Sequence, residues 1–201
     1  MSDDPTQVRE FFGMRAAGWD ARFPGDGPAY AAAVADLGLR PGDAVLDAGC
    51  GTGRALPPLR EAVGPTGTVI GADLTPEMLE EAVRAGRDKA AALILADVAR
   101  LPLPDGALDA VFGAGLISHL AEPAGDLREL ARVVRPGGHL ALFHPIGRAA
   151  LAARHGRRIT DDDLRAEPNL RPMLAGSGWE LLRYVDEDDR YLALAVRRRT
   201  Q

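Results

Sequence analysis

The chain of 201 residues has one cysteine and one lysine, and each scarcity excludes a class of chemistry. Because Cys50 is the only cysteine, an internal disulfide is impossible and a cysteine-based zinc cluster is excluded. Lys89 is the only lysine, which leaves almost no room for Schiff-base chemistry, since that chemistry needs a buried lysine. We expect no metal site.

Long hydrophobic runs and an excess of positive charge are also missing. No apolar stretch approaches the length that crosses a membrane. The acidic start at residues 1–5 lacks the apolar core of a secretory signal. The formal net charge is −5, whereas proteins that bind nucleic acid usually carry basic surfaces. We therefore expect a cytoplasmic protein, a monomer or a homodimer, that binds neither a membrane nor nucleic acid.

What the chain does contain is a regular alternation of short apolar stretches and amphipathic stretches. This alternation predicts an α/β domain with a mostly parallel sheet. The expected strands are 44–48, 68–72, 92–96, 108–112 and 139–143, followed by a hairpin of 179–185 and 190–196 that adds one antiparallel strand. The expected helices are 6–23, 28–39, 54–63, 76–85, 124–134 and 162–175. Residues 135–138 are expected to form a turn, and 144–160 a connecting segment.

A glycine-rich stretch at residues 44–54 organises the sequence. It reads Ala-Val-Leu-Asp-Ala-Gly-Cys-Gly-Thr-Gly-Arg, an apolar strand followed by three alternate glycines and the start of a helix. Glycines let a backbone turn sharply and approach a ligand, and a helix N-terminus favours an anionic group. Arg54 stands where the dinucleotide fingerprint G-x-G-x-x-G requires its third glycine. The stretch does not match the phosphate-binding Walker loop either, because no Gly-Lys-Ser/Thr follows the glycines.

Residues 45–53 resemble the first motif of the class I S-adenosylmethionine-dependent methyltransferases, whose pattern is VLDxGCGTG. The resemblance covers 42–143 at the level of motifs and the rest only in architecture. It implies a Rossmann-like seven-stranded sheet with helices on both faces, S-adenosylmethionine as the cofactor, and a methyltransferase acting on a small molecule. The single domain would then comprise an N-terminal helical lid (1–40), a cofactor-binding core (42–143) and a substrate-side segment with the final hairpin (144–201).

Acidic residues follow three successive predicted strands, at Asp47, Asp73 and Asp97. Ligands of parallel sheets bind beyond the carboxyl ends of the strands. Asp73 lies about 20 residues after the glycines, where an acidic residue meets ribose in dinucleotide folds, and a carboxylate can accept hydrogen bonds from both ribose hydroxyls. The resemblance places Asp47 near the amino-acid part of the cofactor. It also implies that Asp97 receives the adenine amino group.

Apolar residues complete the predicted cofactor set. Val98 and Leu74 would flank the adenine ring, and Met78 fits either that place or the core. Trp19 either belongs to a lid over the methionine end of the cofactor or packs on the domain. The full set is Trp19, Asp47, Gly49, Cys50, Gly51, Gly53, Asp73, Leu74, Met78, Asp97, Val98 and Ala114.

Two histidines are candidates for a general base. A sulfonium methyl group is already activated, so the enzyme mainly aligns the nucleophile and excludes water, and a base removes any proton. His144 ends the fifth predicted strand and His119 follows the fourth; a structural role is an alternative for both. His155 lies in the basic segment 154–158, which is either a solvated loop or a patch for a carboxylate or phosphate of the substrate.

The sequence does not identify the molecule that accepts the methyl group. The chain contains neither Asn/Asp-Pro-Pro-Tyr nor Pro-Cys, motifs of enzymes that methylate adenine, glutamine or cytosine, and this favours a small molecule with an O, N, S or C nucleophile. One rival hypothesis is a cofactor-binding regulatory or scaffold subunit without catalysis. Another is an NAD-dependent oxidoreductase.

Overall fold

The computed structural model describes residues 4–199 as a seven-stranded sheet with the strand order β3-β2-β1-β4-β5-β7-β6. All neighbours pair in parallel except β7, which is antiparallel to both β5 and β6. The predicted fold, with a single antiparallel strand, is therefore confirmed. The strands are β1 (Ala44–Ala48), β2 (Thr68–Asp73), β3 (Ala92–Leu95), β4 (Leu108–Ala114), β5 (Val134–His144), β6 (Trp179–Glu187) and β7 (Arg190–Arg197).

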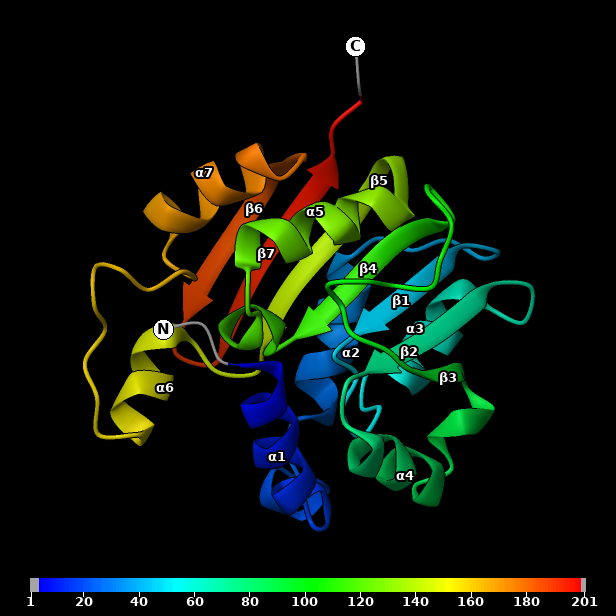
Figure 1. Cartoon of the computed structure of the whole chain (residues 1–201), viewed down its shortest axis with the longest axis horizontal. Coiled ribbons are helices and arrows are strands. Elements are labelled where there is room, and N and C mark those ends of the chain that lie inside the picture. Colours follow the sequence, from blue (N-terminus) through cyan, green and yellow to red (C-terminus); the bar gives the residue numbers. More distant parts are fainter. Residues whose placement is uncertain (1–3, 200–201) are drawn as a thin grey trace.

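Helices cover both faces of the sheet (Figure 1). α2 (Gly27–Asp36) and α3 (Leu56–Val63) pack on one face, and α5 (Pro123–Val133) and α7 (Glu167–Gly176) pack on the other. α3 shows why such helices form, because Leu56, Leu59 and Val63 recur at helical spacing and are fully buried. Gly64 ends the helix with a φ of 66°.

Two further helices, α1 (Pro5–Ala16) and α6 (Arg148–Arg154), lie beyond the carboxyl ends of the parallel strands (Figure 1). α1 buries only Ala16 completely and rests on α4 (Pro76–Arg84), where Gly13 lies against the carboxylate of Glu77. Residues 4–199 include no helix that is long and apolar enough to span a bilayer. The two helices thus flank the edge of the sheet at which ligands of this fold class bind.

Several predicted boundaries were wrong. The expected helix 6–23 is α1 followed by a separate 3₁₀ turn at Asp20–Arg22, because Gly18 takes a φ of 79°. Residues 135–138 extend β5 through a register shift instead of forming a turn. The segment 144–160 contains α6, whose Arg-Ala-Ala-Leu-Ala-Ala-Arg sequence consists of strong helix formers. The expected helix 162–175 begins only at Glu167.

Candidate functional site

A cleft of about 1280 Å³ opens beyond the carboxyl ends of the strands, between α1, the glycine loop and the segment after β5. This volume exceeds the usual size of a small-molecule pocket, so the cleft has room for more than one ligand. All the predicted cofactor-binding residues except Gly53 line it, and so do both candidate bases. Among residues 4–199, no group of three or more His, Cys, Asp or Glu side chains could hold a metal ion.

The glycine loop runs from Gly49 to Gly53 in the left-handed conformations that glycine favours, with φ values of 67°, 54° and 81° at Gly49, Gly51 and Gly53. The first two glycines line the cleft. Gly53 was predicted to lie against the ligand, but it is buried against helices instead. A Cβ atom there would come within 2.8 Å of Leu56 Cδ1 and 3.4 Å of Ala82 Cβ. This glycine therefore permits close helix packing behind the loop.

Asp73 ties the loop to the neighbouring strand. Its Oδ2 atom accepts a hydrogen bond from Gly51 N at 2.7 Å, and its Oδ1 atom accepts one from Thr75 N at 2.8 Å. Burial raises the pKa of this carboxyl, and the backbone donors oppose that rise. Asp73 also lines the cleft, where its carboxylate can accept from a ligand.

Asp47 is the more unusual of the two acids. Its side chain is 2% exposed, yet no described residue donates a hydrogen bond to the carboxylate. Burial, helped by the nearby charge of Asp73, raises its pKa to about 8. A buried carboxylate is costly unless a cation pairs with it. The position therefore suits a positively charged group of a ligand.

Asp97 and its neighbours form the other end of the predicted cofactor site. Asp97 lies just beyond β3 and accepts a hydrogen bond from Ala99 N at 2.9 Å. Val98 and Met78 are buried in the same cleft wall. Asp126, which the sequence analysis missed, also lines the cleft and is 5% exposed. Burial raises its pKa, and the charges of Asp97 and Glu122 act in the same direction.

Arg54 joins the N-terminal segment to the glycine loop, a role that the sequence analysis also missed. Its guanidinium contacts Asp20 Oδ1 and Asp26 Oδ2, both at 3.1 Å. It also donates to the backbone carbonyls of Asp20 at 3.1 Å and Phe23 at 2.6 Å. The side chain is only 12% exposed, so these contacts are largely shielded from water.

Asp20 contacts two further side chains besides Arg54. Its carboxylate accepts from Thr52 Oγ1 at 2.7 Å and contacts Arg87 Nη1 at 2.7 Å. Burial alone would raise the pKa of Asp20, but hydrogen bonds from Thr52 and Arg54 and the charge of Arg87 hold it below the usual value. Residues 20–26 are thereby fastened to the back of the glycine loop. We call Asp20, Asp26, Thr52, Arg54 and Arg87 the latch cluster.

An aromatic cluster extends this segment over the cleft. The ring of Phe12 meets Trp19 and His119 edge-on, with centroid distances of 5.6 Å and 5.0 Å, and Trp19 lies 5.4 Å from Phe23. All four side chains line the cleft. His119 is therefore packed against α1, and Trp19 lies in the wall in which it was predicted.

The arginine of the latch cluster offers a direct test of this attachment. We expect Arg54→Met to lower the free energy of unfolding by about 2 kcal/mol, because it leaves the Asp26 carboxylate without its partner and removes one donor each from the Asp20 carboxylate and the two carbonyls. Urea unfolding would measure the loss, and limited proteolysis would show faster cleavage within 5–26. Arg84→Met is the control, because the Arg84 side chain is 62% exposed and its salt bridges are at the surface. Equal stability of the two variants would contradict the assignment.

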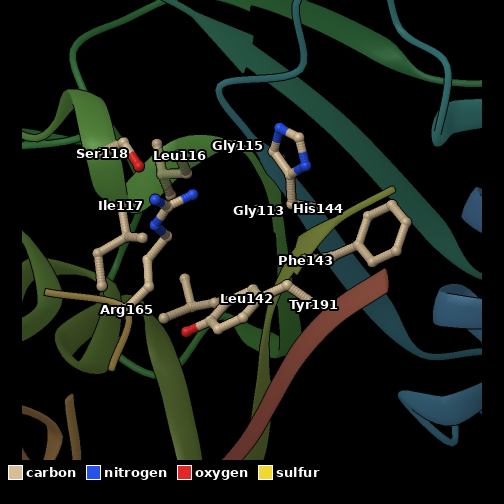
Figure 2. Close-up of a pocket in the computed structure, with 10 residues that line it drawn as sticks. All are labelled: Gly113, Gly115, Leu116, Ile117, Ser118, Leu142, Phe143, His144, Arg165 and Tyr191. Atoms are coloured by element: carbon tan, nitrogen blue, oxygen red, sulfur yellow. The ribbon is translucent and has the colours of Figure 1, made fainter. Parts of the chain in front are cut away.

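His144 also lines the cleft, at the end of β5 (Figure 2). Its Nδ1 atom lies 3.0 Å from Ile146 O and 3.3 Å from Ile146 N. Burial lowers the pKa of its imidazole to about 4, against the opposing effect of the Ile146 carbonyl. The ring is therefore neutral at physiological pH. When Nδ1–H donates to the carbonyl, Nε2 is left as a proton acceptor.

The basic segment predicted around His155 also lines the cleft, at its outer rim. Arg154, His155, Arg157 and Arg158 all contribute to the wall and are exposed. Acidic residues also line the cleft, among them Asp162 and Asp188, so its wall is of mixed charge.

Comparison with known proteins matches residues 46–142 to the family described as "Methyltransferase domain". The chain is 31% identical over 176 residues to the ubiquinone/menaquinone biosynthesis C-methyltransferase UbiE of Ectopseudomonas mendocina (strain ymp), an alignment that covers 73% of this chain and 69% of that protein. It is 44% identical over 110 residues to an uncharacterized 37.1 kDa protein in transposon TN4556 of Streptomyces fradiae, covering 54% of this chain but 32% of that protein.

Among solved structures, a SAM-dependent methyltransferase from Aquifex aeolicus matches with a TM-score of 0.66 and 27% identity. That match covers 80% of this chain and 85% of the other. The chain thus shares the fold of this structure over most of its length. In contrast, it spans only about a third of the Streptomyces relative.

Proposed function

Because the chain belongs to the class I S-adenosylmethionine-dependent methyltransferases, we propose that it binds S-adenosylmethionine in this cleft and methylates a small molecule. The observation that carries the proposal is the pair of buried acids on either side of the glycine loop, Asp47 and Asp73. The two carboxylates face one cleft from adjacent parallel strands. They match a ligand that has a cationic amino group and a ribose.

The residues present fit this cofactor. Asp47 has a buried carboxylate that lacks a partner within the described chain, and the ammonium group of an amino acid would supply one. Asp73 holds the loop through backbone donors and lines the cleft, where its carboxylate would also accept hydrogen bonds from the ribose hydroxyls. Asp97 and the apolar side chains of Val98 and Met78 would hold the adenine. When bound, the cofactor supplies a methyl group that is already activated for transfer.

The chain's own residues would then align the acceptor and keep water out. The aromatic cluster around Phe12 and Trp19 would cover the cleft as a lid, fastened by the latch cluster. His144 would accept a proton from the nucleophile at Nε2, because its lowered pKa keeps it neutral. His119 remains a second candidate, but its ring packs against Phe12.

Titration calorimetry with S-adenosylmethionine and its demethylated product tests the proposal. We expect dissociation constants in the micromolar range, and formation of the demethylated product with members of a panel of phenols, amines, thiols and activated carbon acids. Cofactor binding without turnover on any acceptor would favour a regulatory or scaffold subunit. Binding of NADH in place of S-adenosylmethionine would restore the oxidoreductase hypothesis. The cytoplasmic location and the monomeric or dimeric state stay predictions.

The role of His144 can be separated from cofactor binding. We expect His144→Gln to lower kcat by about 100-fold or more for an acceptor whose nucleophile carries a proton, because general-base catalysis is lost. The affinity for the demethylated cofactor should be unchanged. With saturating cofactor and acceptor, the wild-type kcat should stay constant as the pH falls from 7 and then drop as the pH approaches about 4, where the imidazole becomes protonated. Equal kcat values for the variant and the wild type would exclude this base.

A further inference from the structure

The cleft extends well beyond the acids that are assigned to the cofactor. Those acids follow β1, β2 and β3, which form one side of the sheet. His144 and α6 follow β5, which lies on the other side of β1 in the strand order. α1 lies beyond the same strand ends (Figure 1), and its Phe12 ring reaches His119, which follows β4. The cleft of about 1280 Å³ therefore has a part around His144 that can hold a second ligand.

α1 turns an apolar face to the cleft. Val8, Phe11, Phe12 and Arg15 line the cleft, and their spacing of i, i+3, i+4 and i+7 places them on one side of the helix. Phe11 is 44% exposed, and Val8 and Phe12 are only half-buried. We call Val8, Phe11 and Phe12 the α1 wall. Within residues 4–199, this apolar wall remains partly open to solvent.

The chain after β5 supplies a second apolar surface. Ile146, Leu151, Ala152 and Ile159 line the cleft, and we call them the α6 wall. Ile159 is 43% exposed, and the other three side chains are half-buried. Two segments far apart in the sequence thus present uncovered apolar side chains to one space. Exposed apolar surface of this kind marks a binding groove.

Arg148 fixes the base of the α6 wall. Its backbone N and its Nε atom both donate to the Asp186 carboxylate of β6 at 2.9 Å. Its Nη1 atom lies 3.4 Å from Asp163 Oδ2, and the side chains of Arg148 and Asp163 are only 14% and 13% exposed. The two ends of the segment 149–162 are thereby joined to each other and to the sheet. These contacts place α6 at the cleft as a defined wall.

We propose that the α1 wall and the α6 wall bind an apolar group of the methyl acceptor, with Phe11 and Ile159 in contact with it. The inference rests on the proposed function, because it names the substrate class of the same cleft. The substrate class is a molecule that carries its nucleophile on an alkyl-substituted or aromatic body larger than a single ring. Binding such a body removes both walls from water, and the gain in affinity grows with the apolar area that is buried. The nucleophile then stays in the space that His144 lines.

A homologous series of phenols tests this inference on the full chain loaded with the demethylated cofactor. The probes are phenol and its para-ethyl, para-butyl and para-hexyl derivatives, and titration calorimetry measures their affinities. We expect the affinity to rise about threefold with each added CH₂ group. Phe11→Ser and Ile159→Ser should each lower the affinity for the hexyl derivative by about fivefold or more. Both variants should bind phenol and the demethylated cofactor within about twofold of the wild type.

Each variant has a matched control on its own segment. Met14 in α1 is 77% exposed and Leu164 is 40% exposed, and neither lines the cleft. Met14→Ser and Leu164→Ser should therefore bind the hexyl derivative as the wild type does. Phe11→Leu keeps an apolar side chain in the α1 wall and should retain this affinity within about threefold, which separates lost apolar contact from a disturbed helix.

Two results would overturn the inference. One is an affinity that does not rise with the length of the alkyl group. The other is equal binding of the hexyl derivative by the cleft-lining variants and their controls. Both results leave the proposed function standing if the wild type still binds the demethylated cofactor. Failure of that cofactor to bind would overturn the proposed function, and this inference with it.

Discussion

Replacing Asp73 by alanine is expected to lower the affinity for S-adenosylmethionine by about 100-fold or more. The substitution removes the two oxygens that would hold the ribose. It also leaves the backbone N–H groups of Gly51 and Thr75 without the acceptors that they contact at 2.7 Å and 2.8 Å. The loop would lose its link to β2, so the loss should be larger than that of one hydrogen bond to the ligand. Titration calorimetry with the demethylated product would measure it.

Two further variants make this result specific. Asp73→Asn keeps one oxygen acceptor, so it should retain more affinity than the alanine variant but less than the wild type. Asp88→Ala removes an exposed carboxylate outside the cleft and should change nothing. Wild-type affinity in Asp73→Ala would show that the cofactor does not use this strand end, and the proposed site would be wrong.

The position of Asp73 was predictable because every step of that inference is local. An apolar strand, a carboxylate at its end and a helix start lie within a few residues, and parallel strands bring such ends to one edge of the sheet. The same reasoning located Asp47 and Gly51, and the structure places both in the cleft. It failed for Gly53, because a glycine pattern does not say whether the backbone faces a ligand or a neighbouring helix.

The contacts of Arg54 and the burial of Tyr191 could not be predicted in this way. Arg54 contacts residues 28 to 34 positions before it, in the segment 20–26. Tyr191 is buried because β7 enters the sheet antiparallel to β5, where Tyr191 pairs with His144. Both features depend on how whole helices and strands pack in the tertiary structure. A local sequence pattern carries no information about that packing.

The two buried acids are coupled, and this coupling makes binding depend on pH. Burial raises the pKa of Asp47, and the charge of Asp73 raises it further, to about 8. The free protein therefore holds Asp47 protonated at neutral pH, whereas a bound ammonium group favours the carboxylate. Cofactor binding should then release a proton. Because the two carboxyls interact, the proton that is released has an apparent pKa that describes the pair of acids and not either residue alone.

We expect the affinity for S-adenosylmethionine to rise with pH between about 6 and 8, by up to about tenfold per pH unit. Above about pH 8 it should level off and fall, because the amino group of the ligand then loses its own charge. Calorimetry at pH 7 in phosphate and in Tris would reveal the released proton as a buffer-dependent enthalpy. An enthalpy that does not depend on the buffer would show that Asp47 is already ionised in the free protein.

Asp47→Asn should separate binding from stability. The amide cannot pair with the ammonium group, so affinity should fall by about 100-fold and its rise with pH should weaken. The variant should nevertheless be more stable than the wild type without ligand. Between the ordinary carboxyl pKa of 3.8 and about 8, the unfolded wild-type chain loses a proton that the folded protein keeps. The wild type therefore loses stability as the pH rises through that window, and the variant does not. Thermal midpoints of the two ligand-free proteins, measured at pH 5 and at pH 8, would test this. The midpoint of the variant should exceed that of the wild type by more at pH 8 than at pH 5, and a difference that shrinks as the pH rises would contradict the assignment.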